Sequence, residues 1–172
     1  DWKTLIAQTT DTLESARIVG ERFILTYLRN AHNVVVTSKL DGTNVSPLPL
    51  PGLGSAAGFN GKRTDELSFF SFQTFTTPPS IYLLNPKTGD VSLHHQPKLA
   101  YTPDDFVTRQ VAFQSADGTR VPMFLVHKKG IPLNGDNPTY LYGYGGFNIS
   151  LKPRFRANLI AWLELGGVYA QP

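Results

Sequence analysis

The part of the sequence best suited to chemistry is a loop rich in glycine and aromatic residues, Tyr142-Gly143-Tyr144-Gly145-Gly146-Phe147-Asn148. Glycine contributes no side chain to packing and leaves the backbone mobile, so three glycines at the end of an apolar strand add little stability. Such a loop lets donor groups approach a ligand, and open α/β sheets bind ligands beyond the carboxyl ends of their strands. The alternative is a tight strand-to-helix turn whose aromatic side chains only pack. The loop matches neither a P-loop nor G-x-G-x-x-G, so nucleotide binding is not indicated.

A catalytic nucleophile is not found in the chain. No serine has glycine both two residues before it and two residues after it, as the G-x-S-x-G motif requires. The four histidines, His32, His94, His95 and His127, form no H-E-x-x-H or H-x-E motif, so we expect no metal and no cofactor. We interpret His94-His95 as surface or blade packing, because adjacent strand residues point to opposite faces. We interpret His127 as a solvated strand end.

Composition excludes several classes of protein. The 172 residues are 41% hydrophobic and 17% charged, and no apolar run approaches the ~20 residues of a membrane span. The net charge of +3 comes from scattered residues, which does not indicate a nucleic-acid surface. The chain has no cysteine, which is compatible with a reducing compartment. We expect a cytoplasmic location, or a periplasmic one if a signal peptide precedes Asp1, and the chain looks like part of a longer protein.

The first hundred residues read as an all-β region. Short stretches rich in Val, Ile, Phe, Tyr and Thr are separated by turn residues about every ten positions. These stretches are Arg22 to Leu28, Asn33 to Leu40, Leu67 to Phe75, Ile81 to Leu84 and Val91 to His95. Two turns, residues 39–42 and 85–90, carry the glycine and Asn or Asp that hairpins favour. Their separation of about 45 residues predicts two four-stranded propeller blades, with a β-sandwich as the alternative.

The second region has a different pattern. A polar break at residues 102–105 precedes a hairpin of Phe106 to Gln114 and Val121 to His127, and a short strand follows at Thr139 to Gly143. The spacing then predicts a helix from Pro153 to Leu165, with Pro153 in its first turn, Gly166 at its cap and a further strand at Val168 to Ala170. Strand, helix and strand at this spacing indicate a βαβ unit of a mostly parallel sheet, and so an α/β domain.

Two blocks of sequence, Ser115 to Gly130 and Tyr142 to Ser150, resemble the prolyl oligopeptidase family in order and spacing, and Gly166 to Ala170 resembles the strand that follows. The resemblance implies the last blades of a seven-bladed β-propeller over residues 1–103. It implies the first part of an α/β-hydrolase domain over residues 104–172. The fold class expected is therefore mixed, with all-β propeller blades followed by the start of an α/β-hydrolase domain.

The resemblance also implies the roles of two residues. Tyr144 matches the tyrosine whose hydroxyl donates a hydrogen bond to the tetrahedral oxyanion, between the third strand and the next helix of the hydrolase. Phe147 matches an aromatic residue that lines the pocket for the substrate proline. The implied activity is that of a serine endopeptidase cutting short peptides after proline, monomeric when full length and without nucleic-acid or membrane partners. The triad of Ser, Asp and His would lie beyond Pro172, so this polypeptide alone should be inactive.

Two alternatives stay open. One is a related oligopeptidase of different specificity, although the Gly-Gly-Phe-Asn ending of the loop is typical of the prolyl type. The other is a non-catalytic β-rich binding module that uses the same loop for ligand contact. Two blades alone leave sheet edges unpaired and cores half covered, which argues against an independent module.

Overall fold

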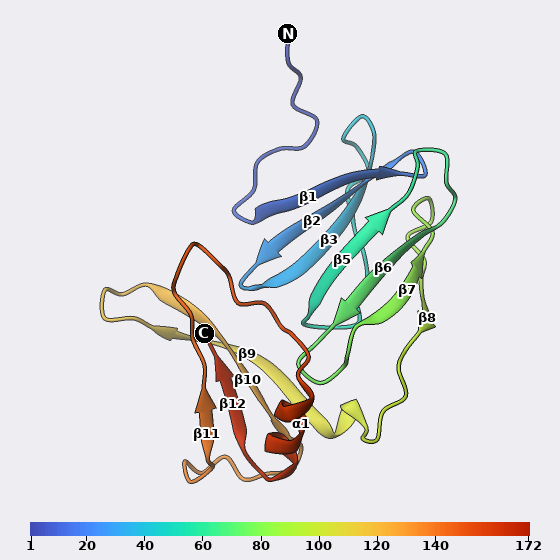
Figure 1. Cartoon of the computed structure of the whole chain (residues 1–172). Helices are drawn as coiled ribbons and strands as arrows, with labels where there is room; N and C mark the ends of the chain where they lie inside the picture. The colour runs from blue at the N-terminus through green and yellow to red at the C-terminus, as the bar shows by residue number, and fades with distance from the viewer.

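The computed structural model describes residues 1–172 and contains three four-stranded sheets and one α-helix (Figure 1). The first sheet comprises β1 (Thr12–Val19), β2 (Arg22–Arg29), β3 (His32–Lys39) and β4 (Ser46–Pro47). The second comprises β5 (Ser55–Asn60), β6 (Ser68–Gln73), β7 (Ser80–Leu84) and β8 (Val91–His95). A 3₁₀ turn at Pro103–Asp105 leads to β9 (Phe106–Gln114), β10 (Arg120–Lys128), β11 (Thr139–Leu141), α1 (Ala157–Glu164) and β12 (Val168–Gln171).

The first two sheets are antiparallel meanders in which each strand pairs with the next along the chain. Both predicted hairpins are confirmed. Gly42 has a φ of 85° and its N–H donates to the Lys39 carbonyl at 3.0 Å, which closes the turn between β3 and β4. Gly89 has a φ of 80° and donates to the Asn85 carbonyl at 2.8 Å, between β7 and β8. Glycine is favoured at both turns because side chains disfavour this left-handed conformation.

The two sheets share one hydrophobic core. Its buried members come from both sheets and from the loop after β4: Val19, Ile24, Val35, Leu48, Ala56, Phe59, Phe70, Phe72 and Leu84. Phe70 lies at the centre, stacked on Phe59 with ring centroids 4.6 Å apart and on Tyr82 at 5.3 Å. Burying a Phe side chain contributes about 1.5–3 kcal/mol, and each aromatic pair adds about 0.5–1.5 kcal/mol. The two blades are therefore one packed unit.

Two of the longer blade strands, β1 and β5, were not predicted from the sequence, and the short β4 was implied only by the turn before it. In β1 the residues Glu14, Ser15 and Arg17 interrupt the apolar pattern, and only Val19 at its end is fully buried. In β5 small residues replace the branched side chains typical of strands, and Gly58 marks a bulge in its pairing with β6. These strands form because each pairs with a neighbouring strand rich in branched or aromatic residues. Their own composition would not predict a strand.

The third sheet has the order β11-β12-β10-β9. Strands β9, β10 and β12 pair antiparallel, and β11 pairs parallel with β12, with Thr139 opposite Val168. The predicted strand–helix–strand unit is confirmed, because β11 and β12 are parallel neighbours joined through α1. The expectation of a mostly parallel sheet is wrong for these strands, since only one of the three pairings is parallel.

Helix α1 begins at Ala157, and the prediction that it begins at Pro153 is wrong. The Pro153 carbonyl instead accepts a hydrogen bond from Ser55 Oγ at 2.7 Å, and the Phe155 N–H donates to Gln73 Oε1 at 3.1 Å. Helical backbone is also disfavoured at a residue that precedes proline, so Lys152, before Pro153, is not helical either. Contacts with the blades therefore delay the helix by four residues.

The end of α1 is as predicted. Gly166 has a φ of 86°, and its N–H donates to the Leu163 carbonyl at 3.0 Å. The Gly167 N–H donates to the Trp162 carbonyl at 3.1 Å, which completes a Schellman motif. None of the helices is long and apolar enough to cross a membrane.

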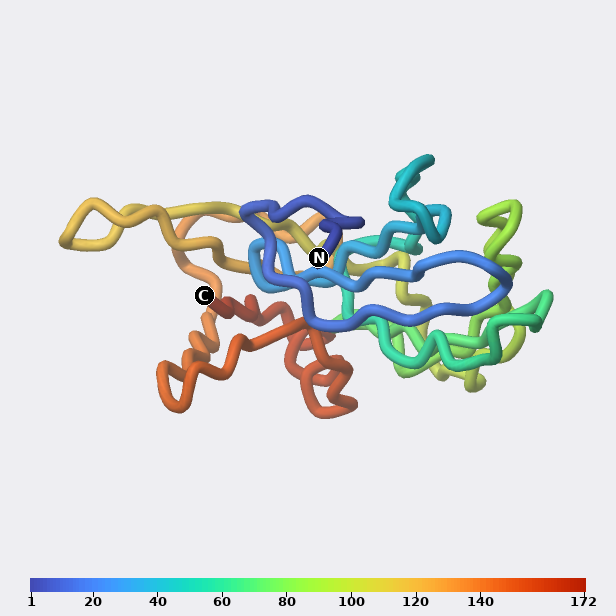
Figure 2. Tube along the Cα trace, turned by 90° about the horizontal axis from the view of Figure 1, so that it is seen from above, coloured from blue at the N-terminus to red at the C-terminus, as the bar shows by residue number.

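A second core joins the third sheet to the blades. Its buried residues are Phe75, Phe106, Phe124, Val126, Leu159, Ile160, Leu163 and Tyr169. Phe75 comes from the turn between β6 and β7, and its ring meets Phe124 at 5.3 Å and Tyr169 at 5.6 Å. Figure 2 shows the β9–β10 hairpin extending away from the blades, so this contact is made near the base of the hairpin and by α1.

Candidate functional site

The glycine-rich loop follows β11, at the carboxyl end of the one parallel pair in the third sheet. The Tyr142 N–H donates to the Ala170 carbonyl at 2.9 Å, which extends the pairing of β11 with β12 by one residue. Beyond Tyr142 the chain leaves the sheet, bends back and passes beside the blades to α1 (Figure 1). The loop is therefore held firmly at Tyr142 and leaves the sheet where α/β folds bind ligands.

Tyr144 is half-exposed on this loop, and none of the side-chain hydrogen bonds in the chain involves its hydroxyl. Its ring lies over Gly146, because a Cβ built on Gly146 would be 2.8 Å from the Tyr144 hydroxyl oxygen and 3.0 Å from Cζ. Only glycine leaves room for the ring in this position. Gly145 has no atom within 4 Å of its virtual Cβ, so the space beside it is open.

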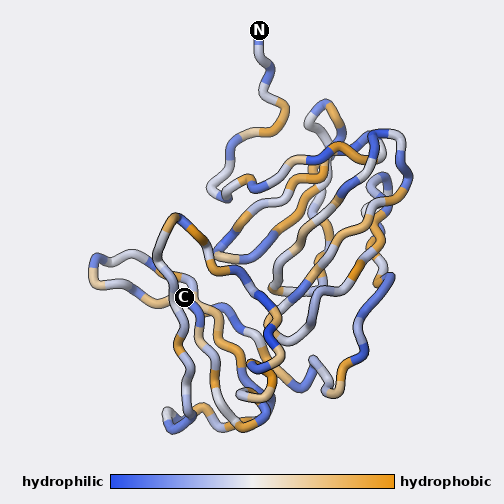
Figure 3. Tube along the Cα trace, in the orientation of Figure 1, coloured by the Kyte–Doolittle hydropathy of each residue, from blue (hydrophilic) through white to orange (hydrophobic).

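Phe147 and Asn148 form a turn of unusual backbone geometry. Both have a φ of 55°, and the Ile149 N–H donates to the Gly146 carbonyl at 3.1 Å across the turn. Asparagine tolerates left-handed backbone, whereas a bulky residue such as phenylalanine rarely adopts it. The Phe147 side chain is 91% exposed, so no packing compensates for this strain. In Figure 3 the outer bend of the loop is a hydrophobic stretch of the trace.

The base of the loop is aromatic. The guanidinium of Arg156 lies over the Tyr142 ring, 5.2 Å from its centroid, and Tyr142 packs against the second core. Tyr140 stands beside Tyr142 and Tyr169, with centroid distances of 6.4 and 5.7 Å. Burial raises the pKa of Tyr169, whose hydroxyl donates to Gln171 Oε1 at 2.9 Å. Tyr142 and Gly146 therefore shape the loop, while Tyr144 and Phe147 remain accessible.

The histidines do not contribute to this loop. His94 is exposed and meets the Phe69 ring edge at 5.1 Å, which agrees with surface packing. The interpretation of His127 as a solvated strand end is wrong, because the residue is only 7% exposed and its Nδ1 lies 2.9 Å from the Lys128 carbonyl oxygen. It sits on β10 beside the buried Val126, a position that a following pair of lysines does not reveal. No cluster of three or more His, Cys, Asp or Glu side chains could hold a metal ion.

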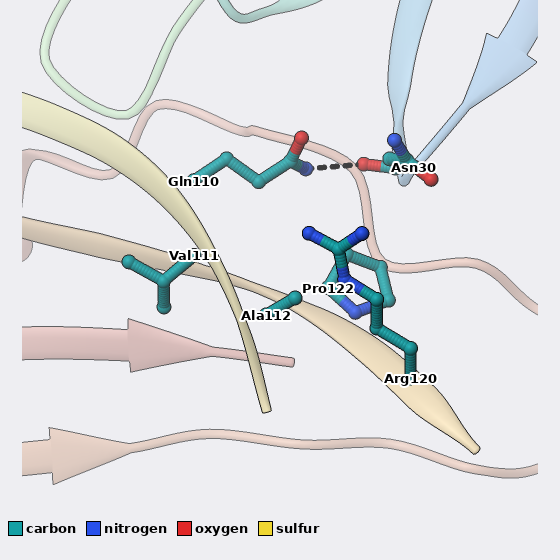
Figure 4. A pocket seen from close by; sticks show the side chains of 6 residues that line it. All are labelled: Asn30, Gln110, Val111, Ala112, Arg120 and Pro122. Carbon is teal, nitrogen blue, oxygen red and sulfur yellow. Dashed lines mark hydrogen bonds between the residues drawn. The ribbon is translucent and has the colours of Figure 1, made fainter. Parts of the chain in front are cut away.

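A separate cavity of about 170 Å³ lies where the β2–β3 turn meets β9 and β10 (Figure 4). It is lined by Asn30, Gln110, Val111, Ala112, Arg120 and Pro122. Gln110 Nε2 donates to the Asn30 carbonyl across it, and the Arg120 guanidinium points into the same space. None of the loop residues lines this cavity, which belongs to the junction between the blades and the third sheet.

Sequence reasoning found the accessible residues Tyr144 and Phe147 but missed the groups that fix the segment after them. Glu14, Ser55 and Gln73 bond to Lys152, Pro153 and Phe155 from 82 to 138 residues away in the chain. No local pattern marks such partners, because each is an ordinary polar residue on a blade strand.

Comparisons with known proteins agree with the resemblance. The family described as the prolyl oligopeptidase N-terminal beta-propeller domain matches residues 1–97. Prolyl endopeptidases from Elizabethkingia meningoseptica and Elizabethkingia miricola are 42% and 39% identical over 171 residues, which is 99% of this chain and 24% of each relative. A solved structure from a study of inter-domain dynamics in two prolyl endopeptidases superposes with a TM-score of 0.90 at 38% identity, over 99% of this chain and 25% of that one.

The chain thus spans about a quarter of the length of these relatives. The propeller expectation for the first region is confirmed over the sandwich alternative, because the matching family is a propeller. That match ends at residue 97, so the hydrolase assignment of residues 104–172 and the roles of Tyr144 and Phe147 stay predictions. On a family match over more than half of its residues and relatives above 30% identity across nearly all of it, the chain belongs to the prolyl oligopeptidase family.

Proposed function

We propose that the full-length protein is a serine endopeptidase that hydrolyses short peptides on the carboxyl side of proline. In this proposal the present chain supplies one donor of the oxyanion hole and part of the proline pocket. The names of its relatives, prolyl endopeptidases at 42% and 39% identity, support the reaction class. The nucleophile, acid and base would come from residues outside this chain, since it has no G-x-S-x-G motif.

The assignment of residues 104–172 to the start of the hydrolase domain rests on chain order. In α/β hydrolases the oxyanion segment lies between the third strand and the helix that follows it. In the third sheet, β11 is the third strand along the chain and α1 is the next helix, with Tyr144 between them. This agreement in order and spacing supports the proposal.

The position of Tyr144 is the single observation that carries the oxyanion role. The Tyr144 side chain is half-exposed, its hydroxyl makes no side-chain hydrogen bond within the chain, and the residue lies beyond the carboxyl end of a parallel strand. A phenol held in this way can donate to an oxygen that becomes negative as the tetrahedral intermediate forms. Removing one such donor costs about 3 kcal/mol of barrier, or about 10²-fold in kcat.

Phe147 is proposed to pack against the pyrrolidine ring of the substrate proline. It is strained and 91% exposed in the chain alone, and such outliers occur at functional sites where another group completes the contact. A flat apolar ring suits proline, which has an apolar ring and no N–H to satisfy once it is part of a peptide.

The test is the Tyr144→Phe variant of the full-length protein, assayed on a short peptide with one internal proline. We expect kcat to fall by roughly 10² with KM changed much less, because the interaction is made in the transition state. Tyr142→Phe is the matched control, since it also removes a phenolic hydroxyl from this loop, but from a ring that packs against the second core. Equal kcat values for Tyr144→Phe and the parent would overturn the oxyanion role.

A further inference from the structure

The segment that joins the Tyr144 loop to α1, residues 151–155, is neither helix nor strand yet is bonded at almost every residue. Gln171 Nε2 donates to the Leu151 carbonyl at 3.1 Å from the third sheet. All the other bonds to this segment come from the blades. We call residues 151–155 the anchored segment.

The first blade contact is an ion pair. Lys152 Nζ donates to both carboxylate oxygens of Glu14 on β1, each at 3.0 Å. Glu14 is itself fixed, because Asn33 Nδ2 donates to its Oε2 at 2.7 Å. Asn33 is 2% exposed and also binds the Tyr27 carbonyl at 3.2 Å, so the carboxylate is oriented by a buried group in the centre of the first sheet.

Asn33 ties the two blades together at the same point. Its Oδ1 accepts from the Ala56 N–H at 3.0 Å, and its own N–H donates to the Gly54 carbonyl at 3.0 Å. Both of these partners belong to the second blade or the loop before it. The Glu14 carboxylate is therefore positioned by both sheets, and its geometry depends on their packing.

The second blade adds two further contacts. Ser55 on β5 and Gln73 on β6 face each other across their strands. Ser55 Oγ donates to the Pro153 carbonyl at 2.7 Å, and Gln73 Oε1 accepts from the Phe155 N–H at 3.1 Å. Ser55 thus occupies a carbonyl that would otherwise accept a bond within a helical turn, and Gln73 satisfies an N–H that a helix starting at Pro153 would leave unpaired.

By contrast, the loop before the anchored segment has little to hold it. Across the turn at Phe147 and Asn148 the only bond is Ile149 N–H to the Gly146 carbonyl, and both turn residues have left-handed backbone. A strained turn persists only where its surroundings fix its two ends. One end is fixed at Tyr142 by β12, and the other is fixed by the blades through the anchored segment.

We propose that Glu14 and Gln73 of the blades are positioning residues for the Tyr144 loop, acting through Lys152 and Phe155. They touch neither substrate nor reacting atoms; they set where the loop lies, and through it the Tyr144 hydroxyl. This inference rests on the proposed function for its effect on catalysis, because the loop must carry a catalytic group for its position to alter kcat. Its structural part, the restraint of the loop by the blades, stands on the contacts alone.

The experiment uses the full-length protein with two measurements, kinetics on a proline-containing peptide and hydrogen–deuterium exchange of residues 144–149. Lys152→Met should lower kcat about threefold and Gln73→Ala about tenfold, with KM within about twofold, and both should speed exchange in the loop. Lys152→Arg and Gln73→Glu keep the cation and the acceptor, and should restore both readouts. Arg154→Met is the matched control, because Arg154 is an exposed cation on the same segment and takes part in no ion pair or side-chain hydrogen bond.

A double variant tests the pairing itself. If Glu14 and Lys152 act as one unit, Glu14→Gln combined with Lys152→Met should lower kcat no further than the larger single effect. The single variants should keep the thermal midpoint of the parent within a few degrees, since the ion pair is partly exposed.

The outcomes separate this inference from the proposed function. If Tyr144→Phe lowers kcat while Lys152→Met and Gln73→Ala leave kcat and loop exchange at parent values, the positioning role is overturned and the oxyanion role stands. If Tyr144→Phe leaves kcat unchanged, the proposed function fails, and faster exchange in Lys152→Met but not in Arg154→Met would still support the restraint. Faster exchange with unchanged kcat in an enzyme that depends on Tyr144 would also overturn the positioning role.

Discussion

The blade sheets and the Tyr144 loop differ in how each residue is supported. In the blades, large side chains such as Phe70 and Phe72 are 1% exposed and packed on both sides. In the loop, Tyr144 and Phe147 are 47% and 91% exposed, and the backbone at Phe147 is left-handed. Stability is concentrated where residues are buried, and the accessible groups lie where backbone strain is tolerated. The blades hold the loop in place, and the loop presents the side chains.

Phe70→Ala should give the largest effect and test the blade side of this comparison. The side chain is 1% exposed and stacked between Phe59 and Tyr82, so truncation leaves a cavity that the sheets cannot close. We expect the full-length protein to lose about 3–5 kcal/mol, measured as a lower urea midpoint of the blade transition. Phe69→Ala on the same strand is the control, because Phe69 is 49% exposed and should cost far less. Similar losses for both variants would contradict the packed blade core.

Gly146→Ala should separate activity from stability in the loop. Its new Cβ would lie 2.8 Å from the Tyr144 hydroxyl oxygen, so the ring must move, while the exposed loop can accept the change. We expect kcat to fall about tenfold, or about 1.4 kcal/mol, with stability unchanged. Gly145→Ala adds a methyl group with no atom within 4 Å and should leave kcat as in the parent. A parent-like kcat for Gly146→Ala would show that the Tyr144 ring position does not matter.

Phe147→Asn should raise stability slightly while it weakens substrate binding. Asparagine adopts left-handed backbone more readily, so the change relieves strain of about 0.5–1 kcal/mol at a φ of 55°. The loss of the ring should raise KM for proline peptides several-fold, as uniform binding is lost. Thermal unfolding and steady-state kinetics check the two parts. A lower melting temperature would mean that the exposed ring is supported by contacts in the full-length protein.

The smallest expected effect is a pH dependence at the β2–β3 turn. Burial lowers the pKa of His32 below its usual 6.5; the Asn30 carbonyl and Asp11 oppose this shift, while Arg29 adds to it. The unfolded chain therefore binds a proton first as the pH falls, so stability from the neutral ring is full above pH 6.5 and is lost below it. His32→Gln should flatten this dependence of the unfolding free energy on pH below about pH 6.5, measured in urea titrations at several pH values. A slope identical to the parent's would show that His32 titrates alike in both states.

The sequence was informative wherever a structure is encoded locally. The turns at Gly42 and Gly89 and the cap at Gly166 follow from the need for left-handed backbone, and all three were predicted. The blade strands rich in branched and aromatic residues were also predicted, because such residues suit a pleated surface. The loop that carries Tyr144 and Phe147 stood out because glycines beside aromatic residues at the end of a strand are unusual for packing alone, and the family resemblance then singled out these two residues.

The features that were missed depend on distant partners. Strand β1 is formed by pairing with β2, and helix α1 starts late because Ser55, 98 residues earlier, takes the Pro153 carbonyl. His127 is buried by packing of the third sheet, although the lysines after it suggest solvent. Such contacts leave no periodic signal near the residues they affect, so the anchors of the candidate site could be found only in three dimensions.

The most direct test of the central claim compares two affinities in the full-length protein and its Tyr144→Phe variant. A peptide aldehyde ending in proline forms a tetrahedral adduct with a serine nucleophile and places an oxyanion before the proposed donor, whereas the matching peptide alcohol cannot. The account predicts that Tyr144→Phe weakens inhibition by the aldehyde about 10²-fold and leaves the affinity for the alcohol within about twofold. Equal weakening of both, or no weakening of the aldehyde, would contradict it.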